Sequence, residues 1–194
     1  MSRHHTLFLV SYVLPFFTGR HEMAAARSAI AALLLFFLFI SSAAGDGGAT
    51  HLHFFFHELY SGGPNGTTVE VSPPRSGNKN GSFFGTVTVV DDVLREGADP
   101  ASRVLGRGQG LTAGVSLDDG ALLTLLDLVF TEGPYNGSTL QVFGRALLGT
   151  VMERPIVGGT GAFRMARGYA LIKMVDSPDP ENLLILEYDA YIWH

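Results

Sequence analysis

The segment from Glu153 to Lys173 constrains the fold more than any other part of the chain. Three glycines, Gly158, Gly159 and Gly161, fall within four residues. Glycine reaches backbone angles that other residues avoid, so this cluster predicts a tight reversal of the chain. From residue 163 to 175 apolar side chains recur with a period of two, which is typical of a β-strand. The segment therefore predicts a glycine turn followed by a long strand.

Similar extended stretches recur along the chain, separated by turns that use many of its 24 glycines and 9 prolines. They are predicted at 51–60, 67–71, 82–90, 103–117, 121–131, 138–150, 163–175 and 182–193. No convincing amphipathic helix interrupts them, so the fold class is all-β. Several strands are apolar on both faces, which favours a closed antiparallel barrel of about eight strands with an interior wide enough for one small ligand. The apolar outer face predicts a homo-oligomer, a dimer or a trimer.

The N-terminal region predicts export from the cell. Residues 29–40 form an unbroken apolar run after Arg27, and small residues follow it. This pattern is typical of a cleaved signal peptide at 23–45, and the run is shorter than the roughly 20 residues that a membrane anchor needs. Because a signal should begin at its own methionine, we expect 1–22 to be an extension outside the native protein; the alternative is one long signal. Residues 46–194 then form one secreted domain without a membrane contact.

Composition narrows the possible partners. The formal net charge of −5 disfavours nucleic acid as a partner. The chain contains no cysteine, so core packing, sheet closure or subunit contacts must stabilise it without disulfides. Three Asn-Gly-Ser/Thr sequons, at Asn65, Asn80 and Asn136, lie in turn-like contexts and are plausible glycan sites for a secreted chain.

Three histidines, His51, His53 and His57, fall on one face of the first predicted strand. Histidine is a common metal ligand, and ligands two residues apart on a strand can converge on one ion. However, no carboxylate shares that face within the strand. We therefore interpret the histidines as an outer-wall row and assign no metal site.

The opposite face of this strand carries Phe54, Phe56 and Glu58. If the aromatic residues point into the barrel, Glu58 ends an apolar stripe and reaches the cavity. A carboxyl group in such surroundings has a raised pKa and can act as a general acid. The alternative is a solvated acid at the end of the strand.

Other polar residues give weaker signals. Arg107, Arg145 and Arg154 could bind a phenolic or anionic oxygen, although most arginines lie at protein surfaces. Asp127, inside an apolar strand, must be paired or line a wet cavity. The glycine cluster lacks the spacing and the following helix of a nucleotide-binding loop. No nucleophile elbow is present.

Five ordered pieces carry a resemblance to a known family: residues 51–58, 84–87, 106–110, 135–139 and 157–169. The last piece, Val-Gly-Gly-Thr-Gly-Ala-Phe-Arg-Met-Ala-Arg-Gly-Tyr, is the most specific. With these pieces the chain resembles the plant dirigent proteins over nearly the whole of 51–194.

The resemblance implies an eight-stranded antiparallel barrel of the dirigent and allene oxide cyclase type, oligomeric and secreted to the apoplast. Members bind phenoxy radicals of monolignols such as coniferyl alcohol and steer their coupling to one stereoisomer in lignan biosynthesis. They use no cofactor and do not oxidise the phenol, because a laccase or peroxidase supplies the radicals. Some relatives act on quinone methides and close rings, an isomerase-like or cyclase-like proton transfer. A non-catalytic barrel that binds small phenols in cell-wall or defence biology is the alternative function.

The resemblance also implies site residues. Glu58 stands where the family has aspartate, and Arg154 corresponds to a family arginine displaced by one position, so both are the expected catalytic residues. The second family acid is replaced by Ala146, and Thr112 lies where coupling members carry a tyrosine. The expected substrate-binding residues are Phe54, Phe56, Arg107, Thr112, Asp127 and Arg145.

Overall fold

A computed structural model describes residues 49–60, 65–77 and 82–194. The predicted extension at 1–22 and signal peptide at 23–45 lie outside the described residues. Within the described part of the chain no helix is both long enough and apolar enough to span a bilayer. The described residues form nine strands and two single-turn 3₁₀ helices.

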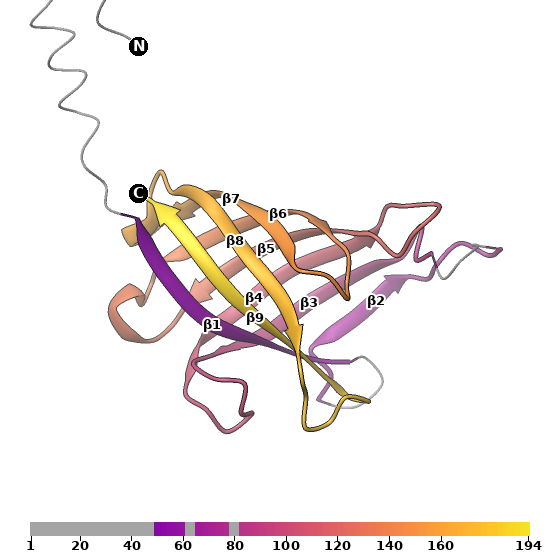
Figure 1. Ribbon diagram of the computed structural model, residues 1–194, viewed down its shortest axis with the longest axis horizontal. Coiled ribbons are helices and arrows are strands. Elements are labelled where there is room, and N and C mark those ends of the chain that lie inside the picture. The colour runs from indigo at the N-terminus through magenta and orange to yellow at the C-terminus, as the bar shows by residue number, and fades with distance from the viewer. Residues whose placement is uncertain (1–48, 61–64, 78–81) are drawn as a thin grey trace, which may run out of the picture. The chain divides into compact units, whose positions relative to one another are not determined.

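The strands run from residue 50 to residue 193 (Figure 1). Their bounds are β1 Thr50–Leu59, β2 Thr68–Ser72, β3 Val87–Arg95, β4 Val104–Gly114, β5 Leu122–Phe130, β6 Thr139–Ala146, β7 Met152–Thr160, β8 Arg167–Val175 and β9 Leu183–Trp193. The 3₁₀ turns are η2, Gly133–Tyr135, and η3, Gly161–Phe163.

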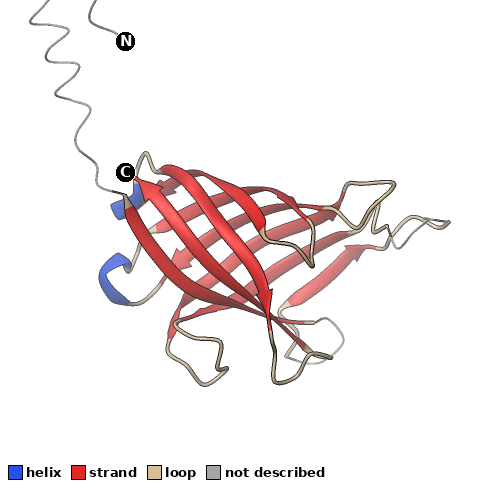
Figure 2. Cartoon of the chain, in the orientation of Figure 1, coloured by secondary structure: helices blue, strands red, loops and turns tan. Residues whose placement is uncertain are grey.

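The strands form one antiparallel sheet in the order β1-β9-β8-β7-β6-β5-β4-β3-β2. A further pairing between β1 and β3 closes eight of these strands into a barrel, and β2 extends the free part of β3. The predicted all-β class and the eight-stranded antiparallel barrel are confirmed (Figure 2). The first and last strands are neighbours over ten residue pairs, from Thr50 opposite Ile192 to Leu59 opposite Leu183.

Closure fixes which side chains point inward, because alternate residues of a strand lie on opposite faces. β5 shows this alternation: Thr124, Leu126, Leu128 and Phe130 are buried, whereas the residues between them are exposed or half-buried. The inner face therefore holds the core and any internal cavity.

The glycine segment differs from the sequence prediction. Gly158 and Gly159 belong to β7, a strand that the sequence analysis missed, and they pair with Gln141 and Leu140 of β6. The reversal comes later, at η3, where Gly161 has φ +61 and a Cβ atom would lie 2.5 Å from the Ser138 hydroxyl. The last strand of the segment accordingly begins at Arg167 rather than at residue 163. Conformational freedom alone predicts a turn at these glycines, whereas close packing requires Gly159, where a Cβ atom would lie 2.4 Å from the Phe163 carbonyl oxygen.

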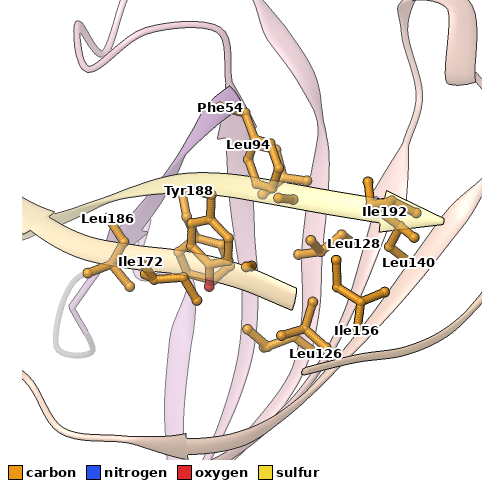
Figure 3. Close-up of a cluster of buried hydrophobic side chains, with 14 of the residues drawn as sticks. Phe54, Leu94, Leu126, Leu128, Leu140, Ile156, Ile172, Leu186, Tyr188 and Ile192 are labelled. Atoms are coloured by element: carbon orange, nitrogen blue, oxygen red, sulfur yellow. The ribbon is translucent and has the colours of Figure 1, made fainter. Parts of the chain in front are cut away.

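The core lies on the inner face of the barrel. Its fully buried side chains include Phe54, Leu94, Leu128, Leu140, Phe163 and Ile192. Figure 3 shows Leu128, Leu140 and Ile192 gathered at one end of this cluster and Leu186, Ile172 and Tyr188 at the other.

Candidate functional site

A pocket of about 290 Å³ lies at the end of the interior where β1, β4 and β6 finish and β5, β7 and β9 begin. This volume is close to the lower limit for small-molecule sites. Its lining is mostly apolar, with a few polar groups from different strands. The lining residues used below are Phe56, Glu58, Thr112, Thr124, Ala146, Arg154, Leu184 and Tyr188.

Small side chains create this space. Thr112, Thr124 and Ala146 occupy inward positions where larger residues would fill the barrel. The neighbouring Gly108 lets the ring of Phe56 pack closely, because a Cβ atom at Gly108 would lie 2.3 Å from that ring. The pocket is therefore a consequence of residue size at a few alternate positions of the strands.

Arg154 is the buried cation of the pocket, with a residue exposure of 3%. Its Nη1 donates a hydrogen bond to the Tyr188 hydroxyl at 3.3 Å, and its Nη2 lies 3.6 Å from the Met152 sulfur. Its Nε is buried without a hydrogen-bond partner. A buried charged donor without a partner costs free energy, so an oxygen acceptor from a ligand would bind favourably to this guanidinium.

Glu58 lies at the end of β1 and lines the same pocket. Burial raises the pKa of its carboxyl group, and the charge of Arg154 lowers the pKa by a smaller amount. Glu58 is half-buried and lies on the pocket side of β1, and its catalytic role stays a prediction. A carboxyl group with a raised pKa can hold a proton near neutral pH and then transfer it.

Two residues of this region escaped the sequence analysis, Tyr188 and Asp92. Tyr188 is fully buried, stacks on Phe54 and Phe56 at ring-centroid distances of 5.0 and 5.8 Å, and has its pKa raised, chiefly by burial. Asp92 is also fully buried. It accepts a hydrogen bond from Thr67, and burial raises its pKa to about 8. Tyr188 could have been found from the alternation of the last strand, whereas Asp92 fell in a stretch predicted as a connection.

The pocket brings together four of the residues expected from the sequence, Phe56, Glu58, Thr112 and Arg154. Ala146, at the position of the missing acid, also lines the pocket. Phe54 does not: it is packed in the dry part of the core, with a residue exposure of 1%. The prediction that Phe54 contacts substrate is therefore corrected.

The other three expected substrate-binding residues lie on the outer face of the barrel. Arg107 forms an ion pair with Asp91 at 2.8 Å, and Arg145 forms one with Asp119 at 2.6 Å. Asp127 accepts a hydrogen bond from Gln141 at 2.9 Å. All three hold odd-numbered positions in strands whose even-numbered positions point inward, so their assignment to the internal pocket is also corrected.

The histidine row divides in two. His51 and His53 are exposed on the outer wall, as predicted. His57 is buried, and its Nε2–H donates to the Gly97 carbonyl at 3.1 Å. Burial lowers the pKa of His57, so this imidazole is a neutral structural donor at physiological pH. His57 faces outward, but the loop containing Gly97 covers it.

Two of the predicted glycan sites can be placed. Asn65 and Asn136 are exposed in turns, as a glycan acceptor requires. Asn80 lies outside the described residues. Whether any of the three carries a glycan stays a prediction.

The fold and the site together define a class: a closed antiparallel barrel with a small internal pocket that holds a buried arginine and a carboxyl group of raised pKa. The family model for "Dirigent-like protein" matches residues 49–193. The chain belongs to the dirigent family.

Named relatives agree with this membership. Dirigent protein 1 of Arabidopsis thaliana is 43% identical over 146 residues, which cover 75% of this chain and 79% of the relative. Pterocarpan synthase 1 of Glycyrrhiza echinata is 40% identical and covers 75% of this chain and 78% of the relative. A solved structure of a pterocarpan synthase dirigent protein superposes with a TM-score of 0.68 at 39% identity, covering 75% of this chain and 84% of that one.

Proposed function

We propose that this protein is a dirigent-type guide that imparts stereoselectivity on the coupling of phenoxy radicals, such as those of coniferyl alcohol, with no oxidising activity of its own. The observation that carries this proposal is the buried Arg154 guanidinium, whose Nε lacks a partner beside an apolar pocket. A phenoxy radical offers a flat apolar ring and one electron-rich oxygen, which matches a pocket of this kind.

The guide would act by positioning. Arg154 would donate a hydrogen bond from Nε to the phenolic oxygen, while Phe56 and Leu184 would hold the ring plane. With one face of the radical covered, a second radical forms the new carbon–carbon bond at the open face. The coupled product is a quinone methide. A side-chain hydroxyl then adds to its methide carbon and loses a proton as the ring oxygen gains one, and Glu58 can carry this proton.

A second candidate function begins from one phenolic alcohol: loss of water gives a quinone methide in the pocket, and a ring then closes on it. The volume of about 290 Å³ favours one phenolic molecule over two, and relatives named pterocarpan synthase reach 40% identity. In this case Glu58 would protonate a leaving hydroxyl, and Arg154 would hold the phenolic oxygen that becomes the quinone carbonyl. Water leaves as the phenolic oxygen releases its proton to solvent. The ring-closing hydroxyl then adds to the methide carbon and returns a proton to Glu58, while the quinone oxygen takes a proton from solvent and becomes a phenol again.

The localisation and the assembly of the protein are part of the same proposal. The chain would be secreted to the apoplast, where a laccase or peroxidase supplies the radicals. It would assemble as a homo-oligomer through the outer face of β4–β7, where Leu111, Leu125, Phe143 and Val157 are exposed around an apolar depression. Burying such a face between subunits removes apolar area from water.

Chiral chromatography tests the proposal. Coniferyl alcohol would be oxidised by a one-electron oxidant with and without the protein, and an enantiomeric excess should arise only with it. R154Q should give a racemic product, whereas the matched outer-face variant E153Q should keep the excess, since Glu153 is exposed next to Arg154.

The second candidate is tested with a phenol that carries a leaving hydroxyl group on the carbon attached to its ring and a second hydroxyl that can close the new ring. Here E58Q should slow ring closure by about 10²-fold, and E153Q should not. The alternative of a non-catalytic binding barrel would be favoured by three results together. The coupling product would be racemic, ring closure would not be accelerated, and fluorescence would still detect phenol binding.

A further inference from the structure

The outer wall of β1 and β9 carries four potential metal ligands that belong to neither the pocket nor its chemistry. His51 and His53 come from β1, and Glu187 and Asp189 come from β9. The register places His53 directly opposite Asp189 and Phe55 opposite Glu187, so the four side chains form a compact patch on one face of two paired strands. β1 alone predicts no metal site, because it offers no carboxylate on this face. The carboxylates come from a strand more than 130 residues away along the chain.

The ligand atoms of this patch are close together. His53 Nε2 lies 2.9 Å from Glu187 Oε1, and His51 Nε2 lies 3.0 Å from Asp189 Oδ1. His53, Glu187 and Asp189 each offer one ligand atom, and these atoms all lie within 4.8 Å of one another. Among the described residues no other group of three such side chains meets this condition.

Neighbouring side chains hold these ligands in position. The ring of Tyr191 stacks on His51 with centroids 4.7 Å apart, and Phe55 packs edge-on to His53 at 5.2 Å. Lys173 pairs with Glu187 Oε2 at 3.0 Å, which leaves Oε1 facing His53. Support of ligands by surrounding residues is characteristic of metal sites.

We propose that this patch binds a divalent transition-metal ion of the zinc class, with His53, Glu187 and Asp189 as ligands and His51 or water in the fourth position. Imidazole nitrogens with carboxylate oxygens suit zinc, copper and nickel better than calcium or magnesium, which prefer oxygen ligands alone. Zinc bonds to nitrogen and oxygen are about 2.0–2.2 Å long, so the ion would replace the two histidine–carboxylate hydrogen bonds and draw the ligands together. Lys173 would remain on the outer oxygen of Glu187 and neutralise part of the negative charge of the ligand set.

The site would join the first strand of the barrel to the last. In a chain without cysteines, a metal ion bound at this seam would take the place of a covalent link between β1 and β9. The bound ion stabilises the folded state because the two halves of the site come together only on folding.

The test uses the purified chain without a polyhistidine tag, stripped of metal with a chelator. Zinc chloride is titrated by isothermal calorimetry, and cobalt(II) serves as a spectroscopic probe of nitrogen and oxygen ligation. We expect one ion per chain, a midpoint of thermal unfolding that rises with zinc, and a loss of affinity of about tenfold or more in H53A and in D189N.

Matched controls separate a built site from scattered surface binding. H194A removes another exposed histidine and E181Q another exposed carboxylate, and both should bind zinc as the unchanged chain does. Circular dichroism of H53A and D189N checks that the barrel still forms. The proposal is overturned if zinc does not bind, if H53A and D189N bind it normally, or if H194A loses it to the same extent.

Discussion

The two ends of the barrel interior differ in the size and polarity of their side chains. At the end near η3, Phe130, Tyr135 and Phe163 pack against one another, with Tyr135 and Phe163 rings 4.7 Å apart and Phe130 and Phe163 rings 5.7 Å apart. At the other end Thr112, Thr124 and Ala146 leave the pocket open around Glu58 and Arg154.

The difference shows how a single closed sheet can separate stability from function. The aromatic end is filled by packed rings, whereas the open end holds the ionisable groups Arg154 and Glu58. Burying Arg154 and Glu58 costs free energy, and the dense packing at the aromatic end offsets this cost. The contrast predicts that substitutions at the two ends will affect different properties.

The largest effect on stability is expected at the aromatic end. Phe163 is fully buried, so F163A should leave a cavity and lower the free energy of unfolding by about 3–5 kcal/mol. Urea unfolding followed by circular dichroism measures the change. M174A, which truncates a side chain that is 52% exposed in β8, is the control and should cost far less. Equal losses in the two variants would contradict the assignment of the core.

A smaller effect, which depends on pH, is expected at Asp92. Its pKa is about 8 in the folded state against an ordinary value of 3.8, so the folded protein binds a proton that the unfolded chain releases. Stability from this group is fully present below about pH 4 and is lost as the pH rises towards about 8, by at most about 1.4 kcal/mol per pH unit. D92N should therefore flatten the fall in unfolding free energy between pH 5 and pH 7.

The neighbouring Asp91 provides the control for this measurement. Its pKa is lowered by the hydrogen bond from Arg107, which is the opposite direction. D91N should therefore remove a stabilising contribution that is present at neutral pH and lost in acid. If the D92N profile parallels that of the unchanged protein, Asp92 is not protonated in the fold.

The smallest effect on stability is expected at the open end. Thr112 faces the pocket, so T112A should change the unfolding free energy by no more than about 0.5 kcal/mol. The same variant should alter the affinity for a phenol, measured by fluorescence titration, because the wall of the pocket changes. A large loss of stability would show that this end is packed like the other.

Much of the fold followed from residue patterns. Alternation along 82–90, 163–175 and 182–193 and the spacing of turns predict the all-β class, and the order of five motifs predicts the family. β7 was missed because Gly158 and Gly159 lie inside it and Pro155 interrupts its pattern. Local sequence does not show that such glycines are required by contact with β6 rather than by a turn.

The candidate site was predicted in part. Glu58 and Phe56 followed from the alternation of β1, and Arg154 followed from the family resemblance. Arg107, Asp127 and Arg145 are misplaced because glycine-rich β4, apolar β5 and mixed β6 do not show from local sequence which face points inward. Tyr188 was missed because its pairing with Arg154 joins residues 34 positions apart.

The pairing of β1 with β9 also determines when the barrel can close during synthesis of the chain. His53 and Glu187 are 134 residues apart, and at about 5–20 residues per second a ribosome needs roughly 7–27 s to make the intervening chain. During that interval β1 has neither its partner β9 nor a closed barrel around it, and an unpaired apolar strand is prone to aggregate. The nascent chain must therefore keep its first strand protected until its last strand has been synthesised.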